Sequence, residues 1–478
     1  MKRASLHLLL TLCPLLLHGE SARAVRTWTD AGGRTLQAAL LGFDSGQVTL
    51  QFPDGKTVRL QAMQLSAADR DFIGQNIGEV FDPITGKAIP MSGEVRHEAM
   101  SFTAGRSWPS TLTATKSLLF ARSAGYDEAT KCQKSRTRRF EYLLHRGVYV
   151  EDVARVCEGT YELLRMSPWG IQAQPQDDFF RVEVFATMAD YYQAGGPEGS
   201  AGVYMINERI FKLPLQSLGI MLPPGYRLAD PSRQMGTLIH EMTHMMMHDV
   251  LELLPMWFIE GSAEYASCIP YEDGVFSPPL VGQGVIREFA RGVKPPGATN
   301  EIRPPLAPLA DLLSISMRQW HEYAIAGAIT PSPGPAKFPT GAADPVRMSS
   351  LYRSSLLLTY YFMNLEGDRR GTRLLQYLEA VRNEQPRWNA WREELFRHLT
   401  AQDEFMKKPE VKKLPDGSFT YPSFLTPPKA PVPPRPEYAS GEVFKIHLPI
   451  LLNGKTAEQV AQEAYQAVAA QGVSLPRR

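Results

Sequence analysis

Between residues 26 and 60 the chain alternates apolar and polar positions in short segments. The segments cover residues 26–29, 35–41, 47–52 and 57–60, and polar turns such as Gly32-Gly33 and Asp54-Gly55 separate them. Period-two alternation between tight polar turns is typical of antiparallel hairpins. The pattern predicts a small curled antiparallel sheet. A short helix over 64–73 completes it, with Ser66 as its cap and Asp69 at the capping-box position.

The middle of the chain changes to helical spacing. Apolar residues recur with the helical period over 149–165, alternation returns over 180–186, 201–206 and 209–213, and helical patterns dominate from 349 to 400. A helix, a small sheet and a long helical remainder together predict an α+β fold. Prolines interrupt residues 292–347 and favour surface loops there.

Proline, glycine and serine mark the connections between these regions. Residues 74–115 are rich in all three and show no period, which predicts a linker. Six prolines stand between Thr426 and Pro436 and favour an extended, polyproline-like segment. Beyond them, Thr456 and Gln459 predict a capped amphipathic helix that ends at Gly472.

The first 24 residues have the pattern of a secretory signal peptide. Lys2 and Arg3 precede a mainly apolar run over residues 6–17, and Ala22-Arg23-Ala24 forms a cleavage site. We expect cleavage near Ala24 and export to the periplasm, the cell envelope or the extracellular space. The apolar run is too short to cross roughly 30 Å of hydrocarbon, and no later run is longer, so we expect no transmembrane segment.

The charge balance excludes broad electrostatic targeting. Lys+Arg number 51 and Asp+Glu number 50, a net charge of +1 that becomes −1 without the leader. Such a balance provides no field that attracts nucleic acid, so we expect no nucleic-acid partner. A hydrophobic content of 44% over 478 residues excludes disorder of the whole chain.

Three cysteines remain after the leader. An exported chain could join two of them, with Cys132–Cys157 as the favoured bridge, or Cys132, Cys157 and Cys268 could all be buried thiols.

The strongest chemical signal is His240-Glu241-Met242-Thr243-His244, an H-E-x-x-H pattern. Asp230-Pro231 supplies a cap and a first-turn proline, and Met235, Leu238, Ile239 and Met242 give a buried helical face. Positions i and i+4 project from one helix face, so both imidazoles can reach one Zn²⁺ while Glu241 faces its water.

A second segment completes this donor set. Glu260 follows His244 after fifteen intervening residues, enough to end one helix, turn at Leu254-Pro255 and return along an antiparallel helix. Two histidines and one glutamate are a typical ligand set of catalytic zinc. Glu264, four residues further, is on the same helix face and is expected to hydrogen-bond a ligand histidine.

Neighbouring residues offer weaker alternatives. His248 lies a further turn along the helix, too far to share one ion with both histidines, and is expected to be solvated or paired with Asp249. Glu252 precedes the turn and is a poorer ligand candidate than Glu260. Residues 245–247 are consecutive methionines, which point in different directions on a helix and indicate core packing rather than a soft-metal cluster.

Peptide-bond hydrolysis also needs a donor for the tetrahedral oxyanion. Tyr352 and His321 are the candidates. An edge strand near 181–187 or 202–206 could align an extended substrate by strand addition.

The H-E-x-x-H motif and Trp257-Phe258-x-Glu260-Gly261-x-Ala263-Glu264 resemble the glutamate zincins, specifically the peptidase MA-like group related to thermolysin and aminopeptidase N. The resemblance spans roughly residues 145–400. It implies a mainly helical zincin domain with a small sheet, zinc held by His240, His244 and Glu260, and Glu241 as general base.

Residues 26–69 resemble the SLA homology domain, type one. The matching positions are Arg26-x-Trp28-Thr29-Asp30, Gly46-x-Val48-x-Leu50, Asp54-Gly55-Lys56 and Leu65-Ser66-x-x-Asp69. The resemblance implies a Src-homology-3-like β-barrel and a short peptide as ligand. Trp28 could contact that ligand, but its place in the first strand favours the barrel core.

These observations predict five regions: a signal peptide (1–24), the small barrel (25–75), a linker and lead-in (76–144), the zincin domain (145–400) and a proline-rich linker with a helical tail (401–478). They predict an exported zinc metallopeptidase that acts on peptide or protein substrates. The alternatives are a non-catalytic cell-envelope binding or structural protein that retains the zinc-binding fold, and a protein whose barrel supplies the main function by peptide capture.

Overall fold

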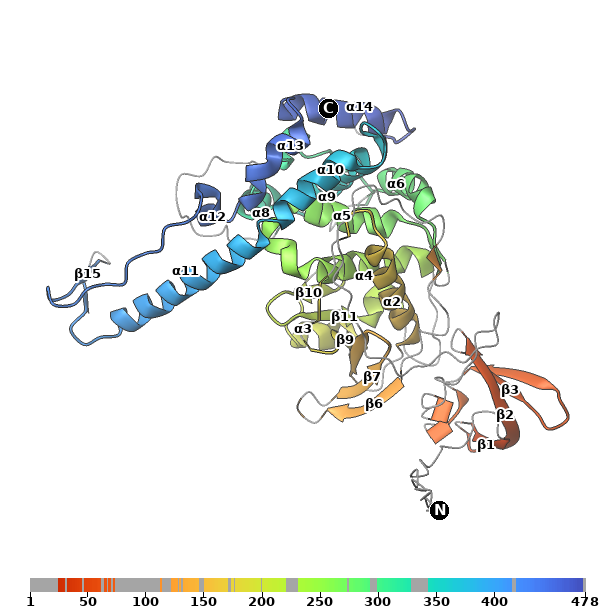
Figure 1. The fold of residues 1–478 in the computed structure, drawn as a ribbon. Coiled ribbons are helices and arrows are strands. Elements are labelled where there is room, and N and C mark those ends of the chain that lie inside the picture. Colours follow the sequence, from red (N-terminus) through yellow and green to blue (C-terminus); the bar gives the residue numbers. More distant parts are fainter. Residues whose placement is uncertain are drawn as a thin grey trace, which may run out of the picture. The chain divides into compact units, whose positions relative to one another are not determined.

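The computed structural model of the chain describes residues 25–73, 112–113, 122–145, 150–220, 231–292, 299–327, 343–414 and 418–475, apart from positions 31, 45–46, 62–63, 67, 70–71, 128, 130–131, 171–172, 176, 199 and 273–274. The expected signal peptide, the linker over 74–111 and the expected cap Asp230 lie outside these residues. The chain divides into two compact units, one containing residues 25–73 and the other nearly all described residues from Ala124 onward (Figure 1).

The first unit is a four-stranded antiparallel sheet in the order β1-β2-β3-β4. Its strands are β1 (Arg26–Thr29), β2 (Thr35–Asp44), β3 (Gln47–Gln51) and β4 (Thr57–Gln61), as the alternation predicts. Trp28 is fully buried in the core of this sheet, and its indole N–H donates to the carbonyl oxygen of Ala38 at 2.9 Å. Trp28 is therefore a core residue rather than an exposed contact for a ligand.

The expected closed barrel is not found, because β1 and β4 do not pair within the described part of this unit. One isolated bridge, Asp30 to Leu65, joins the end of β1 to the segment after β4. Asp69 strengthens this junction, since its carboxylate accepts from the Thr29 amide at 2.6 Å and pairs with Arg26 at 2.9 Å. Ser66 accepts from the Asp69 amide at 3.2 Å as a cap should. The contacts of the Asp69 side chain with β1 thus take the place of part of the pairing that a closed barrel would have between β1 and β4.

A six-stranded mixed sheet begins the second unit, with the order β10-β11-β9-β8-β7-β6. Strands β8, β9 and β11 are parallel to one another. The strands are β6 (Arg122–Asp127), β7 (Cys132–Arg136), β8 (Phe140–Leu144), β9 (Phe180–Phe185), β10 (Val203–Met205) and β11 (Ile210–Pro214). The strands expected over 180–186, 201–206 and 209–213 are confirmed.

The sheet starts at Arg122, ahead of the expected domain start at residue 145. Charged residues within β7 and β8 conceal the strand pattern in the sequence, and Arg136 of β7 pairs with Glu141 of β8 at 2.6 Å. In the turn between the two strands, Arg139 pairs at 2.8 Å with Glu158 of α2, and both of these charges are nearly inaccessible. Their mutual pairing offsets part of the cost of removing both from water.

Three helices build the site. Helix α2 (Glu151–Arg165), the helix predicted over 149–165, packs beside α4 (Pro231–Met246), and α4 contacts β10 and β11. Helix α5 (Met256–Cys268) follows the turn at Pro255 and packs between α4 and α9 (Pro345–Tyr360). The described chain is therefore an α+β fold, as predicted, with a mainly helical second half (Figure 1).

The remaining elements surround this framework. Helices α7 (Leu309–Leu312) and α8 (Met317–Ala326) lie within residues 292–347, where the prolines led us to expect surface loops. A capping box of Ser316 and Gln319 starts α8, and Trp320 is buried. The prolines therefore flank these helices instead of interrupting them. The other elements are β5 (Leu112–Thr113), α3 (Met188–Gln193), η4 (Leu215–Leu218), η5 (His248–Leu253), β12 (Tyr271–Glu272), β13 (Val275–Phe276), η6 (Pro278–Leu280), α6 (Val281–Ala290), α7 (Leu309–Leu312), α8 (Met317–Ala326), η7 (Tyr361–Leu365), α10 (Thr372–Arg382), α11 (Gln385–Met406), β14 (Lys412–Lys413), β15 (Phe419–Thr420), α12 (Pro436–Ser440), η8 (Val443–His447), α13 (Leu448–Leu452) and α14 (Ala457–Ala469).

The C-terminal segment packs on the helical region. Residues 426–435 contain neither helix nor strand, and α14 begins with the predicted capping box of Thr456 and Gln459. Its buried side chains, which include Val460 and Val468, lie on the side that packs against α7 and α9.

The cysteines are not bridged. Cys132, Cys157 and Cys268 are buried and form no disulfide, so the favoured Cys132–Cys157 bridge is wrong and the buried-thiol interpretation holds. None of the described helices combines the length and the apolar character that crossing a membrane requires.

Candidate metal centre

Helix α4 has one face in the core and one face at the site. Met235, Leu238, Ile239 and Met242 are at most 2% exposed, as the helical pattern predicts. The three methionines of residues 245–247 are equally buried, so they are core residues and not metal ligands. This burial fixes the helix about its axis and directs His240 and His244 toward α5.

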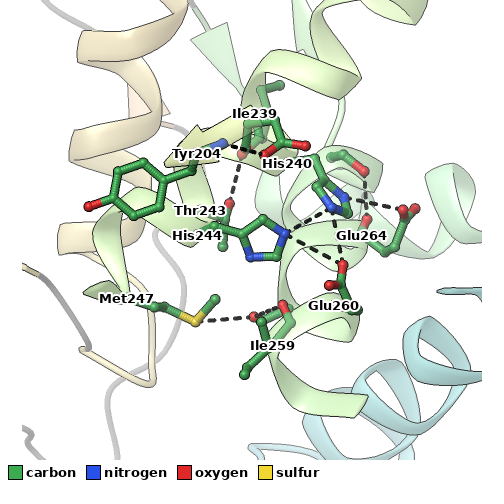
Figure 2. A network of polar contacts seen from close by, with 12 residues as sticks. Tyr204, Ile239, His240, Thr243, His244, Met247, Ile259, Glu260 and Glu264 are labelled. Carbon is green, nitrogen blue, oxygen red and sulfur yellow. Dashed lines mark hydrogen bonds and ion pairs between the residues drawn. The ribbon is translucent and has the colours of Figure 1, made fainter. Parts of the chain in front are cut away.

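Three ligand atoms from α4 and α5 converge at this face. Nε2 of His240 lies 3.0 Å from Nε2 of His244. Oε2 of Glu260 lies 3.3 Å from the first of these nitrogens and 3.5 Å from the second. Figure 2 shows the two imidazole rings and the Glu260 carboxylate pointing toward one another.

These separations suit a tetrahedral zinc ion. Zinc bonds of 2.0–2.2 Å to nitrogen and oxygen place neighbouring ligand atoms about 3.4 Å apart. Oε2 of Glu260 is also buried without a donor in hydrogen-bond geometry among the described residues. A buried carboxylate oxygen that faces two imidazole nitrogens without such a donor is a position that a cation would satisfy.

Two further carboxylates surround the three ligand atoms. Oε1 of Glu264 lies 3.2 Å from Nδ1 of His240, on the far side of the imidazole ring from Glu260. Glu241 lies next to His240 in the sequence, and its Oε2 accepts from the Tyr204 amide of β10 at 3.3 Å (Figure 2). The spacing of four residues between Glu260 and Glu264 on α5 therefore places Glu264 beside His240. The packing of the sheet against α4 places β10 beside Glu241.

The carboxylates at this site differ in their proton affinity. Burial raises the pKa of Glu241, and the nearby histidines only partly offset that effect. Burial acts the same way on Glu260, but the charges and close contacts of His244 and His240 outweigh it and lower the pKa of Glu260. Burial opposes the charged form of His240, and the contacts with the carboxylates of Glu260 and Glu264 raise the pKa of His240 well above the ordinary value. Glu260 thus has the environment of a permanently ionised ligand, and Glu241 that of a proton acceptor.

Of the two expected oxyanion donors, the structure brings only Tyr352 to the site. Its ring packs edge-on against that of His240, with centroids 5.9 Å apart, and no described residue hydrogen-bonds with its hydroxyl. Burial raises the pKa of Tyr352, and Glu260, Glu264 and Glu241 raise it further, so the phenol keeps its proton. His321 is exposed on α8, where its Nδ1 contacts the carbonyl oxygen of Met317 at 2.7 Å. His321 is not among the residues that line the cleft at this site.

The site opens into a cleft of about 910 Å³. The cleft is lined by His240, Glu241 and Tyr352, by residues 200–202 beside β10, and by Arg287 and Arg291 of the α6 end. Local sequence does not identify Arg287 and Arg291 as cleft residues. Their i, i+4 spacing places them on one helix face, but nothing in the neighbouring sequence shows that this face lines the cleft.

Of the two expected edge strands, only β10 is at the edge of the sheet. Strand β9 pairs with β8 on one side and β11 on the other, so the alternative over 181–187 is wrong. The segment over 202–206 contains β10 and lies next to Glu241.

The neighbouring alternatives are directed elsewhere. Nδ1 of His248 lies 2.8 Å from the hydroxyl of Tyr204, so the hydrogen-bond partner of this half-buried histidine is Tyr204 and not Asp249. Tyr204 comes from the adjacent sheet, which the local sequence does not reveal. Glu252 accepts from the indole of Trp388 at 3.2 Å and also contacts Arg392, away from the three ligand atoms.

Gly261 allows the helix that carries Glu260 to approach α9 closely. A Cβ at this position would lie 2.4 Å from the Ser355 carbonyl oxygen and 2.3 Å from Oγ1 of Thr359. The glycine after Glu260 is thus required by helix packing, which places Glu260 beside α4 and Tyr352 over His240.

Comparison with known proteins characterises the first unit only. The family model described as SLA1 homology domain 1, SHD1, matches residues 19–80. No curated protein and no solved structure matches the chain. The N-terminal sheet is therefore similar to an SLA1 homology domain, and the function of the second unit must be argued from its own geometry.

Proposed function

We propose that the protein is a zinc-dependent metallopeptidase whose ion is held by His240, His244 and Glu260. The observation that carries this proposal is the convergence of their ligand atoms at 3.0–3.5 Å, with Glu241 and Glu264 beside them. This donor set and the H-E-x-x-H spacing match the thermolysin-like zincins that the sequence resembles.

A bound zinc ion would supply Lewis-acid polarisation of the scissile carbonyl and of the attacking water. Glu241, with its raised pKa, accepts a proton from that water and delivers it to the leaving amine. Tyr352 donates from its protonated hydroxyl to the oxyanion that forms at the former carbonyl oxygen. Glu264 holds the His240 ring through Nδ1 and keeps Nε2 directed to the ion.

The substrate backbone is aligned along β10. This strand is at the end of the sheet order, and its Tyr204 amide donates to Glu241. An extended peptide that adds to this edge lies within the cleft and next to Glu241, the proton acceptor. Main-chain hydrogen bonds then bring the scissile bond to the site, and no particular substrate side chain is required. Peptides or proteins are the substrates that this geometry suits.

For the first unit we propose binding of a short peptide segment, as its similarity to the SLA1 homology domain suggests. The signal-peptide pattern supports export of the whole protein. Peptide capture by this unit would raise the local concentration of substrate at the catalytic unit. If deletion of residues 25–75 leaves peptide binding unchanged, the first unit does not bind peptide.

The test combines metal analysis with cleavage of a peptide library. Wild-type protein is expected to retain one zinc ion at the histidine site and to cleave members of the library. Glu241→Gln is expected to retain the ion and to lose about 100- to 10,000-fold in rate, the range for removal of a general base. Equal inactivity of both proteins, with zinc bound, would favour the alternative of a non-catalytic cell-envelope binding or structural protein.

A further inference from the structure

A second cluster of ligand side chains lies on three neighbouring strands of the six-stranded sheet. Cys132 begins β7, His145 follows β8, and Glu183 is in the middle of β9. The pairing of Gln133 with Leu144 puts Cys132 beside His145, and the pairing of Leu143 with Glu183 puts the carboxylate on the next strand. Strand register therefore gathers three residues that the sequence separates by up to 51 positions.

This cluster is on the opposite face of the sheet from the candidate metal centre. Phe140 of β8 and Phe180 of β9 contact Tyr161 of α2, the helix that packs beside α4. Side chains alternate along a strand, so His145 and Glu183, at odd positions, point to the other face. The cluster is thus separate from the H-E-x-x-H site.

The three ligand atoms lie close together, and at present the imidazole and the carboxylate are within hydrogen-bond distance. Sγ of Cys132 lies 3.3 Å from Nε2 of His145 and 3.6 Å from Nδ1. Oε1 of Glu183 lies 2.7 Å from the same Nε2. In a catalytic triad, the thiol would contact one ring nitrogen of the histidine and the carboxylate would contact the other. Here both the thiol and the carboxylate lie closest to Nε2, which does not fit a triad.

The surroundings hold these groups in place. Cys132 is inaccessible to solvent and packs with Leu143 and Ile210, while the ring of Phe185 stacks on that of His145 with centroids 4.5 Å apart. The side chains of His145 and Glu183 are 27% and 13% exposed, which leaves a path for an ion from solvent. The amine of Lys212 lies 4.0 Å from the other oxygen of Glu183, Oε2, and donates to the carbonyl oxygen of Ala194. Oε1 is therefore the oxygen directed to His145 and Cys132.

We propose that Cys132, His145 and Glu183 form a second metal site, selective for a thiophilic divalent ion such as zinc. A thiolate, an imidazole and a carboxylate are all zinc ligands, and the thiolate disfavours Mg²⁺ and Ca²⁺. The separation of 3.3 Å between sulfur and nitrogen already suits ligands of one ion, and the carboxylate must retreat to about 3.4 Å from the nitrogen on binding. A water molecule completes four-coordination. Binding releases the thiol proton to solvent.

Cobalt substitution tests this site independently of the peptidase proposal, because the first site contains no sulfur. Full-length protein with His240→Ala and His244→Ala is reduced, freed of metal and titrated with Co²⁺ alone. We expect one bound equivalent and a near-ultraviolet absorption from thiolate-to-cobalt charge transfer. Zinc titration should abolish this absorption by displacing cobalt. Absence of the charge-transfer band in the folded protein would overturn the proposal.

Variants assign the ligands. Cys132→Ser in the same background should remove the charge-transfer band, whereas Cys157→Ser, which removes another buried thiol, should leave it unchanged. Glu183→Gln retains both the thiol and the imidazole and is expected to weaken cobalt affinity more than about tenfold. If Cys132→Ser does not fold, the Glu183→Gln titration decides the question. A band that persists in Cys132→Ser, or an affinity that Glu183→Gln leaves unchanged, would contradict this ligand set.

Discussion

Glu264 of α5 and His240 of α4 face each other across the interface between the two helices, with Oε1 of the carboxylate 3.2 Å from Nδ1 of the imidazole. The opposite ring nitrogen, Nε2, faces Glu260 and His244. A hydrogen bond from Nδ1–H to a carboxylate fixes the tautomer that leaves Nε2 free to bind a metal.

Removal of this carboxylate should weaken the metal site without abolishing it. We expect Glu264→Ala to lower zinc affinity by about 10- to 100-fold, because the His240 ring loses the partner that orients it. Competition with a chromogenic chelator measures the change. Glu410→Gln, an exposed position in the segment after α11, is the matched control and should leave zinc affinity unaltered. Equal affinities of Glu264→Ala and wild type would show that Glu264 does not orient the ligand.

Tyr352 should act on turnover and not on metal content. Tyr352→Phe removes one hydroxyl that no described residue engages, so we expect kcat on a cleaved peptide to fall by about 100- to 1,000-fold with little change in KM. Zinc content should stay the same. Tyr360→Phe, about two turns further along α9, is the control. A loss of zinc in Tyr352→Phe, or an unchanged kcat, would exclude an oxyanion donor at this position.

Gly261 should be sensitive to a single added methyl group. Gly261→Ala places a Cβ 2.4 Å from the Ser355 carbonyl oxygen, so α5 and α9 must separate. We expect the free energy of unfolding to fall by about 1–3 kcal/mol, the cost of overpacking a core. Urea denaturation of the metal-free protein measures it. Gly236→Ala on α4 meets its nearest neighbour at 3.9 Å and should be neutral or stabilising, because alanine favours helix more than glycine.

The C-terminal segment should loosen in acid through Glu384. This carboxylate, only 9% exposed, accepts from the Tyr438 hydroxyl at 2.6 Å and lies 3.0 Å from Nε2 of His447. Burial raises its pKa, but the hydrogen bonds from Tyr438 and His447 outweigh burial and the pKa is lowered overall. A lowered pKa stabilises the folded state above the pH at which the unfolded glutamate ionises, about 4.3, and this stabilisation is lost as the pH falls further.

Glu384→Gln tests this dependence. At neutral pH we expect the free energy of unfolding of the variant to be about 1–3 kcal/mol lower than that of wild type. Tyr438 and His447 then face a neutral amide instead of the charged carboxylate with which they hydrogen-bond. The difference from wild type should shrink as the pH is lowered below about 4.3. Urea denaturation at a series of pH values measures both quantities, with Glu410→Gln as control. A difference that does not change with pH would show that ionisation of Glu384 contributes nothing.

Much of the framework follows from local pattern. The alternation over residues 26–60 predicts all four strands of the first sheet, the helical period predicts α2 and α4, and the spacing with the turn at Leu254-Pro255 predicts α5. The i, i+4 spacing of His240 and His244 places them on one face in any helix. Prediction fails where the decisive contact forms only in the folded protein, as for β7 and β8, where Arg136 pairs with Glu141 across the two strands and Arg139 pairs with Glu158 of α2.

The sequence by itself therefore determined the first sheet, the main helices of the site and the candidate ligands His240, His244 and Glu260, because each depends on short-range periodicity and on side-chain chemistry. Tertiary structure alone decided that Tyr352 and not His321 reaches the site, that β10 and not β9 is the free edge, and that Cys132 lies beside His145 instead of pairing with Cys157. Strand order, register and helix packing set these neighbours. They arise from burial of surfaces contributed by segments far apart in the chain, which no local pattern encodes.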